Sequence, residues 1–275
     1  SLRDFINFVE TRFPDELIRI SNPVDRSFET TATVFEFERA GRFPTVIFEN
    51  VAGFSMPLVT NIASNRTLLA ASLGVGKDDL SRLPIPIQFP VDAAPYITAG
   101  QICARDPETG VDTTGFHRLM LKGPNRLGVS LHSRRRMYEF HRRAEARGEN
   151  LPAVVTLGIH PVHYMGAMAF HYPPNVRKYE IIGALFGQPY QVAKTRTADL
   201  QAPWGAEIVI EGEILANVHE PEGPFGEFTG YASYRSTQNV FVAHRVQMRS
   251  DAMYHSIVSG MSGDHLQISC ISREA

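Results

Sequence analysis

The sequence has few cysteines, almost no net charge and no long apolar run, and each of these absences excludes a class of protein. Cys103 and Cys270 are its only cysteines, too few for a disulfide framework or a four-cysteine metal site. Lysine and arginine number 27 against 29 aspartates and glutamates, so no basic field attracts nucleic acid or anionic lipid. No stretch approaches the ~20 apolar residues that span a bilayer. We therefore expect a cytoplasmic protein with no nucleic-acid or membrane partner.

Several common catalytic motifs are also absent. The chain contains no GxGxxG after a strand, no GxxxxGKS/T and no GxSxG, which disfavours dinucleotide-binding, P-loop and serine-hydrolase interpretations. An apolar fraction of 43% and a charged fraction of 20% are typical of an ordinary globular protein.

Hydrophobic spacing divides the chain into an α/β part and a β-rich part. Residues 2–9 carry apolar side chains at helical spacing behind Ser1, and Asp4 completes a capping-box pattern with that serine. The patterns then predict strands at residues 16–21, 44–49 and 56–61 and a helix at residues 29–40. The stretch GVGKDDLSRLPIPIQFP is rich in glycine and proline, which predicts a boundary between an N-terminal α/β domain, residues 1–82, and a second domain, residues 83–275.

The second part reads as short β-runs separated by turn residues. We expect a β-meander over residues 96–132. Further strands are predicted at residues 152–159, 207–214, 239–248 and 253–258, with a helix at residues 134–146. So many short strands favour a partly closed barrel with flanking helices, and the fold class is therefore α+β.

The segment HEPEGPFGEFTG, residues 219–230, holds three glycines and two prolines and is predicted to be a loop. Glu222 and Glu227 lie five positions apart, so the loop can bring two carboxylates together and raise the pKa of one of them. Such an acid could donate a proton near neutral pH. A surface turn with solvated glutamates is the plainer alternative, but the aromatic Phe225 and Phe228 favour a functional role.

Arg118 lies in the β-run TTGFHRLMLK, where strand alternation would place Phe116, Arg118 and Met120 on one face. An arginine among apolar neighbours needs an anionic partner, either a substrate carboxylate or a structural ion pair, and the spacing does not choose. The run Ser133-Arg134-Arg135-Arg136 begins the predicted helix, and its arginines could bind a phosphate. Such runs are more often a solvated helix face. His160 and His163 have no accompanying HExxH glutamate and are interpreted as structural.

The strings LPIPIQFP, ITAGQICARDPETG, GFHR, YEIIGALFG and EPEGPFGEFTGY, in that order, resemble the UbiD family of prenylated-FMN-dependent decarboxylases. The resemblance covers essentially the whole chain, although family members continue well beyond Ala275. It implies an N-terminal α/β domain followed by a flavin-reductase-like split β-barrel, and a homo-oligomer. It also implies a reversible non-oxidative decarboxylase of an aromatic, heteroaromatic or α,β-unsaturated carboxylic acid, whose prenylated FMN is supplied by a flavin prenyltransferase.

The family's catalytic Glu-Arg-Glu network carries over onto Glu222, Arg118 and Glu227. The resemblance implies that Arg118 orients the substrate carboxylate, that Glu227 delivers the proton that replaces CO2, and that Glu222 tunes the pair electrostatically. Cofactor-binding positions correspond to Thr113, Phe116, His117, Arg118, Arg136, His171, Tyr172, Pro173 and Glu180.

The family binds the flavin phosphate through Mn²⁺, with K⁺ nearby, using an asparagine, a histidine and a glutamate. Glu180 matches the glutamate, Thr113 stands at the asparagine position, and Arg136 or a neighbour stands where histidine is usual. The resemblance therefore implies a metal site with Glu180 and Thr113. Alternatively, an arginine neutralises the phosphate directly and replaces part of the metal's charge.

Two other functions remain open from the sequence. The chain could be a truncated cofactor-binding or assembly module that binds flavin without turnover. It could also be a hydrolase that uses Glu222 and Glu227 as a carboxylate pair, although Trp204, the only tryptophan, provides no sugar-stacking platform.

Overall fold

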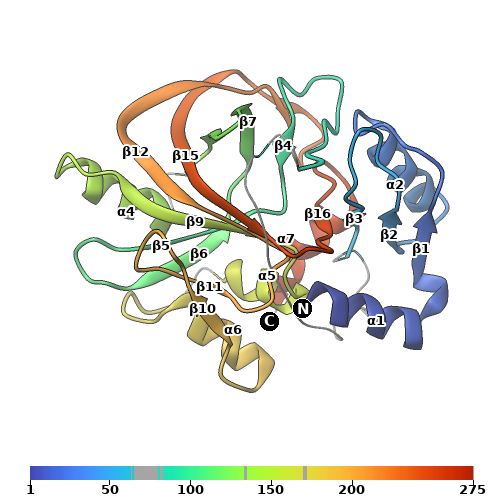
Figure 1. The fold of residues 1–275 in the computed structure, drawn as a ribbon, viewed down its shortest axis with the longest axis horizontal. Helices are drawn as coiled ribbons and strands as arrows, with labels where there is room; N and C mark the ends of the chain where they lie inside the picture. The colour runs from blue at the N-terminus through green and yellow to red at the C-terminus, as the bar shows by residue number, and fades with distance from the viewer. Residues whose placement is uncertain (63, 65–79, 81–82, 133–134, 170–171, 275) are drawn as a thin grey trace.

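The computed structural model contains a small four-stranded sheet beside a large eight-stranded sheet, with helices on both (Figure 1). It describes residues 1–62, 64, 80, 83–132, 135–169 and 172–274, without the side chains of residues 271–274. This is a mixed α/β fold. Among the helices in these ranges, none has both the length and the apolar character needed to cross a membrane.

The small sheet has the strand order β1-β2-β3-β16. Its strands are β1 (Leu17–Ile20), β2 (Thr45–Phe48), β3 (Leu58–Thr60) and β16 (Tyr254–Ser256), accompanied by α1 (Leu2–Arg12), η1 (Pro14–Glu16) and α2 (Glu29–Arg39). The capping box predicted at Ser1 and Asp4 is present. The predicted strands and helix of this region are confirmed to within two residues at each end. β16 pairs in parallel with β3 (Figure 1), so a segment from the far end of the chain completes this sheet.

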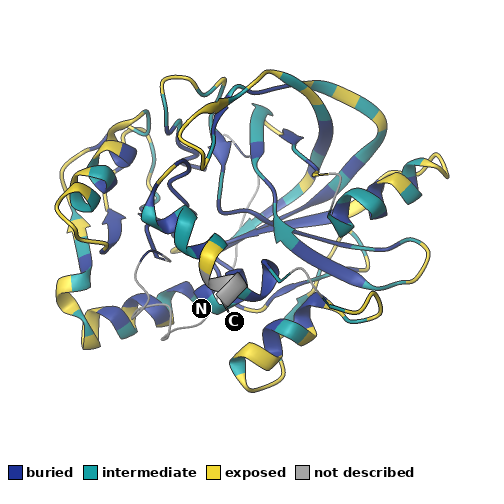
Figure 2. Ribbon diagram, turned by 180° about the vertical axis from the view of Figure 1, so that it is seen from behind, coloured by how far each residue is buried: buried dark blue, intermediate teal, exposed yellow. Residues whose placement is uncertain are grey.

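The large sheet is antiparallel and follows the order β4-β7-β8-β15-β12-β9-β5-β6. Its strands are β4 (Tyr96–Ile97), β5 (Gln101–Arg105), β6 (Asp112–Phe116), β7 (Leu119–Gly123), β8 (Arg126–Val129), β9 (Leu151–Leu157), β12 (Ile208–Glu222) and β15 (Ser236–Met248). Buried residues run along these strands, and exposed residues gather at turns and helix ends (Figure 2). No pairing between β4 and β6 closes the sheet within the described part of the chain.

The predicted meander is wrong at two connections. Its first run is split into β4 and β5, which lie toward opposite ends of the sheet and do not pair. β5 pairs with β6 and β7 pairs with β8, but β6 and β7 belong to opposite ends of the sheet. The chain crosses between those ends at His117 and Arg118, so Arg118 lies outside any strand. Alternation alone cannot distinguish a hairpin from a crossing, because the pairing partner of β5 on its other side, β9, lies far along the sequence.

The predicted loop at residues 219–230 is also partly wrong. β12 continues through Glu222, and β13 (Phe225–Gly226) pairs with β14 (Ala232–Ser233) in a small ribbon. Glycine and proline marked the interruption correctly, but tertiary pairing with β15 extends the strand through Pro221 and Glu222. Glu222 therefore ends β12, and Glu227 directly follows β13.

Helices α4 (Arg136–Glu145), α5 (Pro161–Ala167), α6 (Lys178–Phe186) and α7 (Gly263–Glu274), and the ribbon β10 (Val192–Lys194) with β11 (Gln201–Pro203), complete the fold. The helix predicted at residues 134–146 is confirmed as α4. His160 caps α5 by accepting a hydrogen bond from the Val162 N–H at 3.1 Å, and His163 contacts the Tyr190 hydroxyl at 2.8 Å. Both histidines are buried.

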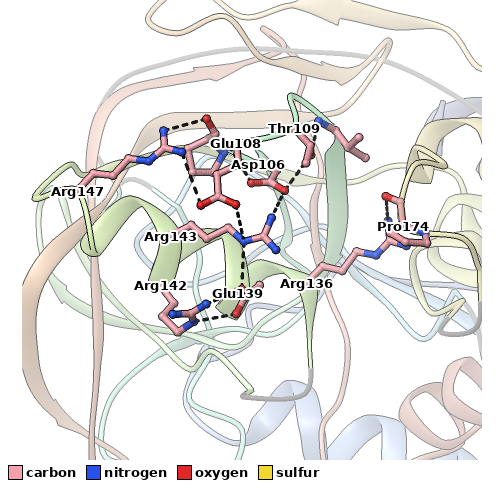
Figure 3. A network of polar contacts seen from close by, with 11 residues as sticks. Asp106, Glu108, Thr109, Arg136, Glu139, Arg142, Arg143, Arg147 and Pro174 are labelled. Atoms are coloured by element: carbon pink, nitrogen blue, oxygen red, sulfur yellow. Dashed lines mark hydrogen bonds and ion pairs between the residues drawn. The ribbon is translucent and has the colours of Figure 1, made fainter.

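An ion-pair network ties α4 to the turn between β5 and β6 (Figure 3). Arg143 reaches Asp106, a buried aspartate of that turn, with 2.5 Å between Nη1 and Oδ2, and also Glu139, with 3.0 Å between Nε and Oε1. Arg142 reaches only Glu139, at 2.7 Å on the helix surface. The network fixes the orientation of α4 and so the position of its first residues.

Candidate active site

A cavity of about 610 Å³ lies among the large sheet, the starts of α4 and α6, and α7. That volume is in the range of small-molecule and cofactor sites, roughly 300–1,000 Å³. Hydroxyl-bearing, aromatic, apolar and charged side chains share its wall. They include Thr98, Thr113, Thr114, Phe116, His117, Arg118, Arg135, Arg136, Met137, Met168, Tyr172, Lys178, Phe225, Glu227, Ile257, Ser259 and His265.

Arg118 contacts both of the predicted glutamates. Its Nε and Nη2 donate to Oε1 and Oε2 of Glu222 at 2.9 and 2.8 Å, and its Nη1 donates to Oε1 of Glu227. The Glu222 side chain is fully buried, whereas those of Arg118 and Glu227 are 17% and 29% exposed. The three charges therefore run from the protein interior to the cavity, with Glu227 outermost.

Aromatic and backbone contacts hold this triad in place. The Arg118 guanidinium carbon lies 5.1 Å from the centre of the Phe225 ring, which packs 4.6 Å from the Tyr96 ring. The Gly223 N–H donates to the Tyr96 hydroxyl at 3.1 Å. Asp92 accepts from the Gly226 N–H at 2.9 Å, immediately before Glu227. Each end of the turn that carries the glutamates is thus anchored to residues 92–96.

The electrostatics favour the charged form of Arg118. Burial disfavours the charge on Arg118, but hydrogen bonding and attraction from Glu222 and Glu227 outweigh it and raise the pKa of the guanidinium. Burial and the nearby Glu222 raise the pKa of Tyr96, so its hydroxyl stays protonated. Burial also raises the pKa of Asp92 against the opposing effect of its backbone hydrogen bonds.

The residues expected to border a flavin are brought together in part. Thr113, Phe116, His117, Arg118, Arg136 and Tyr172 line the cavity. Pro173 and Glu180 are exposed and are not among the lining residues, and His171 lies outside the described residues. Burial lowers the pKa of His117 to about 4, so its imidazole is neutral at pH 7. Its Nδ1 lies 3.1 Å from the Ser130 carbonyl, which can only accept, so Nδ1 carries the proton.

Comparison with known proteins gives two family matches. Residues 10–83 match the 3-octaprenyl-4-hydroxybenzoate carboxy-lyase N-terminal domain, and residues 69–262 match the 3-octaprenyl-4-hydroxybenzoate carboxy-lyase Rift-related domain of UbiD. This chain belongs to the UbiD family.

Individual UbiD relatives agree with that assignment. Anhydromevalonate phosphate decarboxylase of Methanothermobacter thermautotrophicus is 30% identical over 282 residues, which cover 92% of this chain and 65% of that protein. An evolved dimeric form of the UbiD-class enzyme HmfF from Pelotomaculum thermopropionicum, in complex with prFMN, is 34% identical with a TM-score of 0.91, covering 100% of this chain and 71% of that one. The closed form of Sedimentibacter hydroxybenzoicus vanillic acid decarboxylase has the same fold, with a TM-score of 0.91 at 24% identity over 99% and 67% of the two chains. The chain thus spans about two thirds of the length of these relatives.

Arg136 has a different role from the phosphate ligand considered for this UbiD chain. Its Nη2 donates to the Tyr172 and Pro173 carbonyls at 3.1 and 2.8 Å, and its Nη1 to the Val176 carbonyl at 3.2 Å. The same Nη1 donates to the Pro174 carbonyl at 3.3 Å (Figure 3). The four terminal N–H groups of the guanidinium are therefore engaged by one loop. These contacts hold residues 172–176 against the start of α4.

The residues present do not fit the Mn²⁺ site of the UbiD resemblance. Thr113 lines the cavity, but Glu180 is exposed and its carboxylate accepts from the Arg177 N–H at 3.1 Å as a cap of α6. Within the described ranges, no group of three or more histidines, cysteines, aspartates and glutamates could hold a metal ion.

Three residues of the UbiD site escaped sequence reasoning: Tyr96, Asp92 and Lys178. Tyr96 and Asp92 accept hydrogen bonds from the Gly223 and Gly226 N–H groups, which lie more than a hundred residues away in sequence. Lys178 had a signal, because helical spacing places it on the same face of α6 as the core residue Ile182. A lysine on a core-facing position is unusual and marks a site.

Proposed function

We propose that this chain forms the catalytic and cofactor-binding part of a cytoplasmic, reversible, non-oxidative decarboxylase that uses prenylated FMN. Its substrate would be a small carboxylic acid with an adjacent double bond or aromatic ring. The observation that carries the proposal is Arg118 held between Glu222 and Glu227 at the wall of a flavin-sized cavity. Family membership and a relative described in complex with prFMN support it.

The volume and lining of the cavity support a bound flavin. Phe116, Met137, Met168 and Ile257 offer apolar wall for a ring system, and a cationic region that includes Lys178 and Arg135 suits a phosphate. A prenylated flavin bound there would supply an electron sink for the electron pair left when CO2 departs, which side chains lack. We also propose that the curved open sheet is a flavin-reductase-like split barrel.

Arg118 would position the substrate. Three of its five N–H donors are engaged by the glutamates, which leaves one on each terminal nitrogen for the substrate carboxylate. The two-point contact with Glu222 fixes the plane of the guanidinium before substrate arrives, so little ordering is needed on binding. Loss of CO2 removes the negative charge that Arg118 attracts, which favours release of the product.

Glu227 would supply the proton. It is the outermost member of the triad and lines the cavity, so it can exchange protons with solvent between turnovers. The bond from carbon to the carboxylate breaks, CO2 leaves, and the same carbon takes the proton of Glu227. The carboxylate left behind is stabilised by Arg118, and fully buried Glu222 keeps that arginine in place.

The test is CO2 release from a panel of aromatic and α,β-unsaturated acids by the cofactor-loaded protein and its Glu227→Gln variant. We expect a fall of at least about 100-fold in the variant, with the flavin still bound. Glu220→Gln is the matched control, because Glu220 pairs with Arg126 and Lys122 and is not a cavity residue. Bound flavin without CO2 release by the wild type would instead indicate a cofactor-binding or assembly module.

A carboxylate-pair hydrolase is disfavoured by the geometry, because Arg118 lies between the two glutamates where such an enzyme needs room for substrate or water. We propose further that a flavin prenyltransferase supplies the cofactor and that the protein is a homo-oligomer; a dimeric relative supports the second point.

A further inference from the structure

Lys178, the first residue of α6, is a buried lysine at the cavity wall. Lys178 is 4% exposed, and its Nζ donates to the Ala167 and Ala169 carbonyls at 2.7 and 2.5 Å. No ion pair joins it to a carboxylate in the part of the chain that the structure describes, and the charged groups that act on it there are Arg135 and Arg136. The site therefore holds a positive charge that the described protein groups leave uncompensated.

A buried charge without a counter-ion is costly, and the surroundings of Lys178 make it more so. Burial, Arg135 and Arg136 together lower the pKa of its ammonium to about 7. Two of the three ammonium protons are taken by the carbonyls, so one donor remains. An anion bound in the cavity beside Lys178 would remove the cost and use that donor.

The groups around the Lys178 ammonium position it to bind such an anion. The Tyr172 ring lies 4.9 Å from the Lys178 Nζ and 3.8 Å from the Arg136 guanidinium carbon, so one aromatic ring contacts both cations. Arg136 engages its terminal donors with the loop of residues 172–176. Lys178 therefore keeps a donor to offer, while Thr113 adds a hydroxyl-bearing side chain to the wall.

We propose that the Lys178 ammonium binds the phosphate of the flavin cofactor directly and supplies the charge that a divalent metal would otherwise bring. This inference rests on the proposed function, because it assumes a flavin in the cavity. It accounts for the failure of Glu180 and Thr113 to form a metal site.

A purely structural role for Lys178 makes a different prediction. Ala167 is the last residue of α5, and a lysine that only satisfies carbonyls at that helix end would affect stability but not the choice of ligand. Comparison of FMN with riboflavin separates the two roles, because the molecules differ only in the phosphate.

The experiment titrates wild type, Lys178→Met and Lys194→Met with FMN and with riboflavin, following flavin fluorescence, in EDTA and again with Mn²⁺. Lys194 is exposed and pairs with Asp199 outside the cavity, so it is the matched control. We expect wild type and control to bind FMN equally well in EDTA and Mn²⁺. In Lys178→Met, the Kd for FMN should rise by at least about tenfold, while that for riboflavin changes less than about threefold.

Equal weakening of FMN and riboflavin in Lys178→Met, or no change in either, would overturn the inference, as would FMN binding by wild type that EDTA abolishes. The EDTA comparison needs no variant, so it tests independence from a divalent metal even where Lys178→Met does not fold. Failure of the wild type to bind either flavin would remove the proposed function, and this inference with it.

Discussion

Arg118 and Glu222 meet in a planar two-point contact, Nε to Oε1 at 2.9 Å and Nη2 to Oε2 at 2.8 Å. They lie 104 residues apart in sequence and meet only because the chain crosses between the ends of the large sheet at Arg118. The contact fixes one edge of the guanidinium and directs the other toward Glu227 and the cavity. The pairing is therefore a positioning device for the remaining donors of Arg118.

Arg118→Lys should keep the charge but lose the planar contact, because an ammonium offers a single point of attachment. We expect CO2 release, measured as kcat/KM on the best substrate of the panel, to fall by roughly 100- to 1,000-fold while flavin stays bound. Arg126→Lys is the control, since Arg126 makes a comparable contact with Glu220 away from the cavity. Retention of activity by Arg118→Lys would show that charge alone suffices.

Arg143→Met should destabilise the protein by about 2 kcal/mol, because buried Asp106 would lose its cationic partner. Arg142→Met, one position earlier on α4, should leave the denaturation midpoint unchanged, since Arg142 pairs only with Glu139 at the surface. Urea unfolding of the two variants measures the difference. Equal effects would mean that Asp106 does not anchor α4.

Acid should destabilise the protein through its buried histidines. Burial lowers the pKa of His255 to about 3 from an ordinary 6.5, so the unfolded chain takes up the proton first as pH falls. The stability that depends on neutral His255 is therefore complete above pH 6.5 and is lost progressively between about 6.5 and 3, by about 1.4 kcal/mol per pH unit. Buried carboxyls with raised pKa, such as Asp92, act in the opposite direction.

A histidine variant isolates this contribution. His255→Gln can still accept the hydrogen bond from the Tyr164 hydroxyl, but it cannot take up a proton. Its free energy of unfolding should depend less steeply on pH between 6.5 and 5 than that of the wild type. His244→Gln, at a half-exposed position on β15, should show the wild-type slope. Identical slopes for all three proteins would refute the assignment.

Local sequence patterns predicted the helices and strands well where interactions between near neighbours in the chain determine them. The capping box of Ser1 and Asp4 begins α1, and apolar spacing located α2, α4 and the strands β1, β2, β3 and β9. What the patterns could not predict was pairing between distant segments. β16 belongs to the N-terminal sheet, and β6 and β7 do not pair although only His117 and Arg118 separate them, because strand partners depend on the whole chain.

The site shows the same division. Glu222 and Glu227 were expected to be close because they flank a glycine and proline turn, and the resemblance added Arg118. The strand character of Glu222 came from pairing with β15, which local composition does not reveal. Tyr96 and Asp92 were missed because their partners in the turn lie far along the chain. The assignment of Glu180 to a metal came from the resemblance, but the buried face of α6 carries Lys178.

The central claim, decarboxylation that depends on a prenylated flavin, is tested most directly by producing the protein with and without a flavin prenyltransferase. The absorption spectrum and the mass of the extracted cofactor identify what is bound, and CO2 release from the acid panel measures activity. We predict a cofactor with the mass of prenylated FMN and CO2 release only in the protein produced with the prenyltransferase. CO2 release of equal rate from protein that carries no prenylated flavin would contradict the account.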